Sequence, residues 1–281
     1  MDGTLYVVAT PIGNLDDLSP RARRTLADVD LIAAEDTRHT RRLLSHFGIK
    51  TPQFALHDYN EEEAARTLIG ELLAGKSVAL VSDAGTPLVS DPGYRLVRAA
   101  HEHGIKVSPI AGASAVTAAL SAAGLPSDRF CFEGYLPTRQ KARRDRLSDL
   151  AREPRTIVFY ESVHRIRDFL IDIVDAFGED RSAFIGRELT KLHEQCVQAP
   201  LGELLQQIDD DRITRKGEFV VVVAGSRAAD KSSLDVDRLL IELADQMPGK
   251  QAARIVARAT GAKRNTLYQR LLDLKNRDNL D

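Results

Sequence analysis

A short apolar run that ends in a loop of small residues and prolines is the feature of this sequence that most restricts its fold. Val78–Val81 is wholly apolar and predicts a buried strand, and residues 82–93 after it are mostly Ser, Asp, Gly, Thr and Pro. A helical pattern begins directly afterwards at Tyr94. In an open α/β sheet, ligands bind outside the carboxyl ends of the strands, and small residues let a ligand approach the backbone closely. Because Pro87 and Pro92 restrict the loop's conformation, we expect it to be pre-formed and to bind a small molecule.

Length and composition favour a globular protein with more than one domain. The chain has 281 residues, 43% hydrophobic and 28% charged, which is ordinary for globular proteins of this size. It contains no long apolar run of the kind that spans a membrane and no secretory signal. Cys131 and Cys196 lack metal or redox spacing, so we expect reduced thiols in a cytoplasmic protein. The net charge of −2 excludes general polyanion binding, so a nucleic-acid partner requires local basic patches.

The first segment, residues 1–128, alternates short β-rich runs with helical patterns. This alternation predicts a mostly parallel sheet with helices on both faces. Strands are expected at Leu5–Ala9, Leu31–Ala34, Val78–Val81 and Lys106–Ile110, and helices at Ser19–Ala27, Thr40–Phe47, Glu61–Ala74, Tyr94–His103 and Ala113–Ala123.

The pattern changes near Phe130, where an apolar run is broken by Gly134 and Pro137 and a basic helix begins. We therefore expect a second α/β domain at residues 129–228, with Phe219–Val223 as a buried central strand. Residues 229–281 are helical in pattern and predict a small helical domain. The fold class is α/β, with two α/β domains and this C-terminal addition. The remaining expected strands are Thr156–Tyr160, Ser182–Gly186, Gln195–Gln198 and Glu218–Ala224, and the C-terminal helices are Leu234–Gln246, Lys250–Thr260 and Lys263–Leu274.

Four loops that contain Gly or Pro follow strands of the first segment or its boundary. The sequence has neither a GxGxxG loop nor a Walker loop, so a dinucleotide or nucleoside triphosphate site lacks its usual phosphate-binding loop. One such loop alone is weak evidence for a ligand, because α/β turns use these residues routinely. The four loops are Thr10–Asn14, Asp83–Gly93, Pro109–Ala115 and Glu133–Pro137.

Taken in order, these loops resemble those of the tetrapyrrole methylase superfamily of S-adenosylmethionine-dependent enzymes, within it the branch that methylates ribosomal RNA. The resemblance covers about residues 4–225. It implies two α/β domains with the methyl donor in the cleft between them, and a homodimer. It also implies transfer of the methyl group to a ribose 2′-hydroxyl of a cytidine in the decoding region of 16S rRNA, in the small ribosomal subunit. Further matching residues are Val8–Leu15, Ala34–Arg38, Phe159–Arg165, Gly186–Lys191 and Lys216–Glu218.

Methyl transfer from a sulfonium needs alignment more than it needs a metal, because the donor leaves as a neutral thioether. We therefore expect a donor pocket made largely of backbone, with N–H groups at a helix start facing the donor's carboxylate. For Ser114, simple capping of that helix is the alternative, and for Tyr135 it is packing between the domains. The residues expected to bind the donor are Pro11, Asp83, Ala84, Gly85, Thr86, Pro87, Ser114, Ala115, Tyr135 and Leu136.

A ribose hydroxyl is a poor nucleophile while it keeps its proton, so a carboxylate is expected near the methyl group. Glu35 and Asp36 follow a strand of the first segment and are the candidate catalytic residues. The alternative for both is that they cap and complement the positive end of the following helix. No metal site is expected.

Two basic clusters and the C-terminal segment are candidates for contact with RNA phosphates. Residues 250–281 hold eight Lys and Arg residues against three Asp, and their pattern is that of a helix-turn-helix. The alternatives are a solvated helix face for the clusters and a small structural bundle for the C-terminal segment. The cluster residues are Arg38, Arg41 and Arg42 in the first, and Arg139, Lys141, Arg143 and Arg144 in the second.

Three functions remain open on the sequence. The first is an rRNA ribose methyltransferase, and the second is a methyltransferase acting on a tetrapyrrole such as a precorrin. The third is a nucleic-acid-binding protein whose α/β part senses a ligand. The two basic clusters and the basic C-terminal helices favour the first, because a small anionic tetrapyrrole would not require them.

Overall fold

The computed structural model describes residues 3–226 and 236–277. The chain divides into two compact units, residues 1–224 and 225–281. The first unit contains two five-stranded sheets, and the second is helical. Within the described ranges, no helix is long and apolar enough to cross a membrane.

The first sheet is entirely parallel, as the sequence predicts, with the strand order β3-β2-β4-β1-β5. The central strands β2 and β4 are short and almost wholly buried, which explains their continuous apolar character. The strand β3 was not expected from the sequence. The strands are β1 (Thr4–Val8), β2 (Leu31–Ala34), β3 (Gln53–Ala55), β4 (Val78–Val81) and β5 (Lys106–Ile110).

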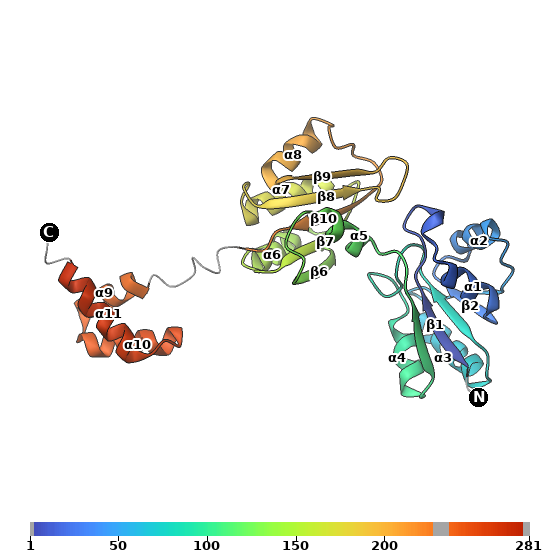
Figure 1. Ribbon diagram of the computed structural model, residues 1–281, viewed down its shortest axis with the longest axis horizontal. Helices are drawn as coiled ribbons and strands as arrows, with labels where there is room; N and C mark the ends of the chain where they lie inside the picture. The colour runs from blue at the N-terminus through green and yellow to red at the C-terminus, as the bar shows by residue number, and fades with distance from the viewer. Residues whose placement is uncertain (1–2, 227–235, 278–281) are drawn as a thin grey trace. The chain divides into compact units, whose positions relative to one another are not determined.

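Helices cover both faces of this sheet, which confirms the expected layers (Figure 1). The strand β4 shows how the faces are divided, because alternate side chains of a strand point to opposite sides. Val78 and Leu80 pack with α3 (Glu61–Leu73) and α4 (Tyr94–Glu102). Ala79 and Val81 pack on the other face, with α1 (Pro20–Asp28) and α2 (Thr37–His46).

The second sheet is mixed, with the order β6-β7-β10-β8-β9. The pair β6 and β7 is parallel, and the other pairs are antiparallel. The strand β10 lies at the centre with five of its six residues buried, as predicted for the apolar run Phe219–Val223. The strands are β6 (Phe130–Tyr135), β7 (Thr156–Ser162), β8 (Ser182–Arg187), β9 (Gln195–Pro200) and β10 (Glu218–Val223).

One face of the second sheet is covered by three helices and the other by a helix that precedes the sheet in the chain. The helices α6 (Gln140–Leu150), α7 (Ile166–Phe177) and α8 (Leu201–Asp209) share a core with β7, β8 and β10. On the opposite face, α5 (Ala115–Ala122) packs against Val158, Phe184 and Val222. The sequence placed this helix in the first segment. Its packing instead joins the first segment to the second sheet.

The second unit is a three-helix structure with its own core. Leu240, Val256 and Leu271 are buried together, one from each helix. Gly261 ends the middle helix with φ +73°, a conformation that favours glycine. The first two residues of the helix expected at Leu234–Gln246 lie outside the described residues. The helices are α9 (Val236–Gln246), α10 (Gly249–Thr260) and α11 (Arg264–Arg277).

Candidate functional site

The loops that follow β1, β4 and β5 are hydrogen-bonded to one another at the carboxyl edge of the first sheet. Thr10 and Gly85 exchange both backbone hydrogen bonds, with N–O distances of 2.8 and 3.1 Å. The hydroxyl of Thr86 donates to the carbonyl of Ala113 at 3.1 Å. Leu88 and Ser90 adopt positive φ angles of 73° and 70°, a strained state for such residues that is concentrated at functional sites. The three loops therefore form one fixed surface.

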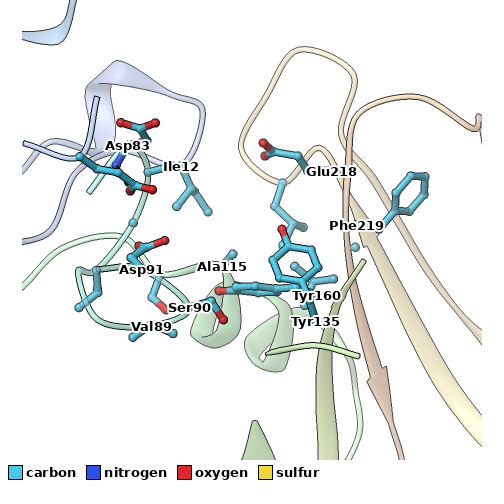
Figure 2. Close-up of a pocket in the computed structure, with 18 residues that line it drawn as sticks. Ile12, Asp83, Val89, Ser90, Asp91, Ala115, Tyr135, Tyr160, Glu218 and Phe219 are labelled. Carbon is cyan, nitrogen blue, oxygen red and sulfur yellow. Dashed lines mark hydrogen bonds between the residues drawn. The ribbon is translucent and has the colours of Figure 1, made fainter. Parts of the chain in front are cut away.

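This surface is one wall of a cleft of about 210 Å³, and residues of the second sheet form the other wall (Figure 2). The cleft lies where ligands bind in open α/β sheets, outside the carboxyl ends of the strands. From the first sheet's side it is lined by Ile12, Glu35, Asp83, Ala84, Gly85, Thr86, Val89, Ser90, Asp91, Ser114 and Ala115, and from the second sheet's side by Tyr135, Tyr160, Gly186, Leu189, Glu218, Phe219 and Val220.

The cleft has an acidic lining. Glu35 Oε2 accepts from the backbone N–H of Asp83 at 3.3 Å, and Asp83 Oδ1 accepts from the N–H of Asp36 at 3.1 Å. Burial, together with the charges of Asp83 and Asp58, raises the pKa of Glu35. Burial also raises the pKa of Asp91 to about 6, and the charges of Glu35 and Asp83 add to this rise. No lysine or arginine of the described residues lines the cleft. A cation therefore fits this cleft better than an anion.

Two tyrosines form the aromatic part of the opposite wall. The rings of Tyr135 and Tyr160 meet edge to face with centroids 5.6 Å apart, and Phe132 packs on Tyr160 at 4.9 Å. Burial raises the pKa of Tyr160 to about 12 and raises that of Tyr135 as well. Both phenols are therefore neutral near pH 7, and they offer flat apolar surface with one polar atom each.

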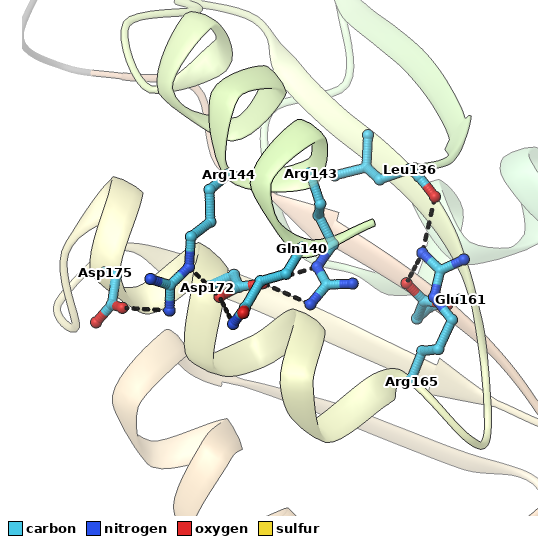
Figure 3. A network of polar contacts seen from close by, with 8 residues as sticks. All are labelled: Leu136, Gln140, Arg143, Arg144, Glu161, Arg165, Asp172 and Asp175. Atoms are coloured by element: carbon cyan, nitrogen blue, oxygen red, sulfur yellow. Dashed lines mark hydrogen bonds and ion pairs between the residues drawn. The ribbon is translucent and has the colours of Figure 1, made fainter. Parts of the chain in front are cut away.

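Most of the residues that the sequence singled out for donor binding meet in this cleft. Pro11 lies outside it and lines an adjoining pocket. Pro87 and Leu136 are buried beside the cleft and do not line it; Leu136 offers its carbonyl to Arg165 at 2.7 Å (Figure 3). Ser114 occupies the N-cap position of α5, but its side chain makes no capping hydrogen bond. The residues brought together are Asp83, Ala84, Gly85, Thr86, Ser114, Ala115 and Tyr135.

The two candidate bases have different surroundings. Glu35 lines the cleft. Asp36 does not line it and caps α2, where its Oδ1 accepts from the N–H of Arg38 at 2.8 Å. Hydrogen bonds from the side chain and backbone of Arg38 lower the pKa of Asp36 to about 2. A group with that pKa is a weak base near pH 7, so Glu35 is the better candidate.

The basic helix α6 is largely neutralised by acidic residues, which corrects the expectation for Arg143. Asp172 on α7 is fully buried and accepts from Arg143 at 2.7 Å and from Arg144 at 2.6 Å (Figure 3). The Arg143 side chain is only 5% exposed, so it holds α6 against α7 and is not available to a phosphate. Arg144 also reaches Asp175, whereas Arg139 and Lys141 are exposed.

The helix α2 carries the first basic cluster, Arg38, Arg41 and Arg42. Arg38 is exposed and paired with Asp36 at 3.0 Å. Arg41 and Arg42 are exposed, and the structure gives neither an ion pair within the described residues. Arg42 lines the same adjoining pocket as Pro11. Arg41 and Arg42, but not Arg38, are therefore available to an anion.

Three titratable residues of the cleft were not singled out from the sequence. Asp91 lies in the predicted loop but was not singled out, although a carboxylate between Ser90 and Pro92 was visible. Tyr160 and Glu218 come from strands of the second sheet. In the sequence they were marked only as members of the matching segments Phe159–Arg165 and Lys216–Glu218, without a role. No group of three or more His, Cys, Asp or Glu side chains in the described parts of the chain is arranged to hold a metal ion.

Two family descriptions match separate parts of the chain. Residues 4–205 match the family described as Tetrapyrrole (Corrin/Porphyrin) Methylases. Residues 230–275 match the RsmI C-terminal HTH domain. The first match lies within the unit of residues 1–224, and the second match lies within the helical unit of residues 225–281. The two matches therefore follow the division of the structure.

Curated relatives are similar to this chain over nearly its whole length. Ribosomal RNA small subunit methyltransferase I of Xylella fastidiosa is 53% identical over 95% of this chain and 98% of its own. The protein of the same name from Escherichia coli O157:H7 is also 53% identical, over 96% and 95%. A solved uroporphyrin-III C-methyltransferase from Thermus thermophilus, complexed with S-adenyl homocysteine, has the same fold, with a TM-score of 0.54 and 18% identity over 79% of this chain and 97% of its own.

Proposed function

This chain belongs to the tetrapyrrole (corrin/porphyrin) methylase family, and on that premise we propose that it is an S-adenosylmethionine-dependent rRNA methyltransferase. Its substrate is the small ribosomal subunit, and the acceptor is a ribose 2′-hydroxyl of a cytidine in the decoding region of 16S rRNA. We further propose that it acts in the cytoplasm as a homodimer. The identity of about one half to rRNA methyltransferases over almost the full length supports this substrate class.

The observation that carries the proposal is the acidic cleft. S-adenosylmethionine presents a sulfonium and an ammonium group, and the lining supplies carboxylates of Glu35, Asp83 and Asp91. Lysine and arginine are absent from that lining within the described residues. The N-terminal end of α5, at Ala115, adds backbone N–H groups for the donor's own carboxylate. The charged groups of the cleft therefore complement those of the donor.

The donor supplies an activated methyl group, and the chain's own residues align it and handle one proton. Carboxylates beside the sulfonium hold the donor by charge, and the fixed loops restrict its position. As the ribose oxygen forms its bond to the methyl carbon, the carbon–sulfur bond breaks and the hydroxyl proton moves to Glu35. Burial raises the pKa of Glu35, which makes it a stronger base than an exposed carboxylate.

Methyl transfer can be measured directly with a labelled donor. Purified protein is incubated with S-adenosylmethionine carrying a tritiated methyl group and with small subunits that lack the modification, naked 16S rRNA or a precorrin. The RNA is then digested to nucleosides and separated. We expect label in 2′-O-methylcytidine. Label only in the precorrin would assign the protein to tetrapyrrole methylation, and RNA binding without any transfer would make it a binding protein.

The base is tested with a matched pair of variants in the same assay. Glu35→Gln should lower kcat by about a hundredfold, because a general base typically contributes a factor of this order. Asp36→Asn should lower kcat by less than about threefold, because Asp36 caps α2 outside the cleft. A larger loss of kcat in Asp36→Asn than in Glu35→Gln would make Asp36 the base.

A further inference from the structure

A second pocket adjoins the acidic cleft, and we call it the α2 pocket. It has a volume of about 320 Å³ and is lined by the loop after β1, by α2, by the loop after β4 and by two residues from the second sheet's side. The two pockets share a wall, which is made by Ile12, Asp83, Ala84 and Glu218. Figure 2 shows Ile12 and Asp83 on one side of the cleft and Glu218 on the other. A group in the α2 pocket is therefore next to a ligand of the cleft.

The α2 pocket differs from the cleft in charge. Its lining adds His39, Arg42 and Lys191 to the shared Asp83 and Glu218, whereas the cleft has four carboxylates and no cationic side chain within the described residues. Arg42 is exposed, and Arg41 beside it extends the positive surface along α2. An anionic ligand is thus favoured in the α2 pocket and disfavoured in the cleft.

Lys191 has a structural role at this pocket. Its Nζ is held by Glu188 at 2.9 Å and by Glu218 at 2.8 Å, so its charge is balanced within the protein. Its stem lies against Gly13, where an added Cβ would meet Lys191 Cγ at 2.3 Å. Because Lys191 is balanced, Arg42 is the side chain that we expect to bind a ligand phosphate. A larger residue at Gly13 would push the Lys191 stem and narrow the pocket.

Apolar side chains complete the α2 pocket. Pro11, Leu15 and Leu43 line it, and Leu15 is 39% exposed, which is high for a leucine beside a structured loop. Apolar surface next to an unpaired arginine fits a nucleotide, since bases and sugars pack on apolar side chains while phosphates bind arginine.

We propose that the α2 pocket holds the acceptor nucleotide of the RNA strand. Arg42 binds a backbone phosphate, Leu15 and Leu43 contact the base or sugar, and the ribose hydroxyl faces the shared wall at Asp83 and Ala84. The two pockets meet at these shared residues, so the hydroxyl oxygen contacts the methyl carbon directly as the carbon–sulfur bond breaks. The proposal rests on the proposed function and specifies where its RNA substrate is bound.

Charge reversal at Arg42 tests the proposal, with a matched reversal elsewhere as the control. Arg42→Glu should raise KM for small subunits by at least about tenfold, because it replaces a phosphate contact with a repulsion. Affinity for S-adenosylhomocysteine, measured by calorimetry, should change by less than about twofold since Arg42 is outside the cleft. Arg152→Glu is the control: Arg152 is exposed and precedes β7 at the end of that strand opposite to Tyr160. It should leave both quantities near those of the wild type.

A second variant narrows the pocket without changing a charge. Gly13→Ala should raise KM for the small subunit by moving Lys191 into the α2 pocket, again with unchanged S-adenosylhomocysteine affinity. Wild-type KM in both Arg42→Glu and Gly13→Ala would overturn the inference while leaving the proposed function intact. Loss of S-adenosylhomocysteine binding in both would also overturn it, because the pocket would then belong to the donor. An inactive wild type would instead remove the proposed function on which the inference depends.

Discussion

Asp91 is a residue whose ionisation is strongly affected by the cleft. It lies among other carboxylates with no cationic side chain in the lining of the cleft within the described residues, and burial raises its pKa to about 6. The raised pKa means that folding favours the neutral form of the Asp91 carboxyl. A bound cation does the opposite and favours the ionised form, so donor binding and loss of the Asp91 proton are linked.

We predict that the affinity for S-adenosylmethionine falls as the pH is lowered through about 6. Below that pH the carboxyl must lose a proton when the cation binds, so affinity should be about tenfold weaker at pH 5 than at pH 7. Calorimetry at the two pH values measures this change. Asp91→Asn should bind more weakly at pH 7 and lose most of the pH dependence.

S-adenosylhomocysteine is the control for this prediction, because its sulfur is uncharged. Its affinity should depend on pH much less than that of S-adenosylmethionine. Equal pH dependence for both ligands would show that the sulfonium is not near Asp91.

At the scale of elements, the joined loops after β1, β4 and β5 determine the shape of the cleft. Gly85 is central to them, because it pairs with Thr10 at φ +83° and an added Cβ would lie 3.3 Å from Ile12 Cγ2. Gly104 also has a positive φ, +68°, but no heavy atom lies within 4 Å of an added Cβ there. Alanine at Gly104 would add backbone strain alone, whereas alanine at Gly85 would add similar strain and also disturb the cleft.

We predict that Gly85→Ala and Gly104→Ala both lower the free energy of unfolding by about 1 kcal/mol, the usual cost of alanine at positive φ. Only Gly85→Ala should weaken donor binding, by about tenfold, since one rigid loop surface positions the ligand. Urea denaturation and calorimetry measure the two effects. Equal donor affinity in the two variants would contradict the role of the joined loops.

The contact between α6 and α7 gives a second prediction at this scale. Arg143→Ala removes one partner of the fully buried Asp172 and should lower the free energy of unfolding by about 3 kcal/mol, as for other broken buried ion pairs. KM for the small subunit should stay unchanged in the folded variant. Arg139→Ala, at the exposed N-cap position of α6, should cost less than about 0.5 kcal/mol. Wild-type stability together with weakened RNA binding would restore Arg143 as a phosphate contact.

Much of the fold could be predicted because buried parallel strands are continuous apolar runs bounded by Gly and Pro. The strand β3 escaped prediction because three residues carry too little pattern. The strand β6 was not predicted because Gly134 interrupts its apolar run, at the place where the pairing with β7 shifts register. The helices α7 and α8 were also not predicted.

Apart from Tyr135, the candidate site was predictable only on the wall that the first sheet's loops form. Each of the joined loops on that wall directly follows a strand, β1, β4 or β5, in the chain, so local sequence indicates where the loops are. Tyr160 and Glu218 reach the cleft through pairing and packing of distant segments, which local pattern does not contain. For the same reason the ion pair of Arg143 with Asp172 was invisible, because the acidic partner lies on another helix.

At the scale of the whole molecule, the two units have separate cores. The four core clusters of residues 1–224 include no residue of α9, α10 or α11, and the three helices share a cluster of their own. The helical unit carries most of its charge in residues 250–281, with eight Lys and Arg residues against three Asp. This excess of positive charge suits contact with RNA phosphates.

We predict that a protein truncated after Ala224 folds and binds S-adenosylhomocysteine within about twofold of the full chain, because every residue of the cleft is retained. Its kcat/KM for the small subunit should fall by about tenfold or more, with a weaker dependence on salt, through loss of the basic helices. Full activity of the truncated protein would show that the helical unit has no part in RNA binding.

The most direct measurement is a crystal structure of the protein with S-adenosylhomocysteine. We predict that the ligand lies in the cleft between the loops after β1, β4 and β5 and the Tyr135–Tyr160 wall, with its sulfur facing the wall shared with the α2 pocket. A ligand bound at another site, or a cleft that stays empty at saturating ligand, would contradict the assignment of the donor on which the proposed reaction depends.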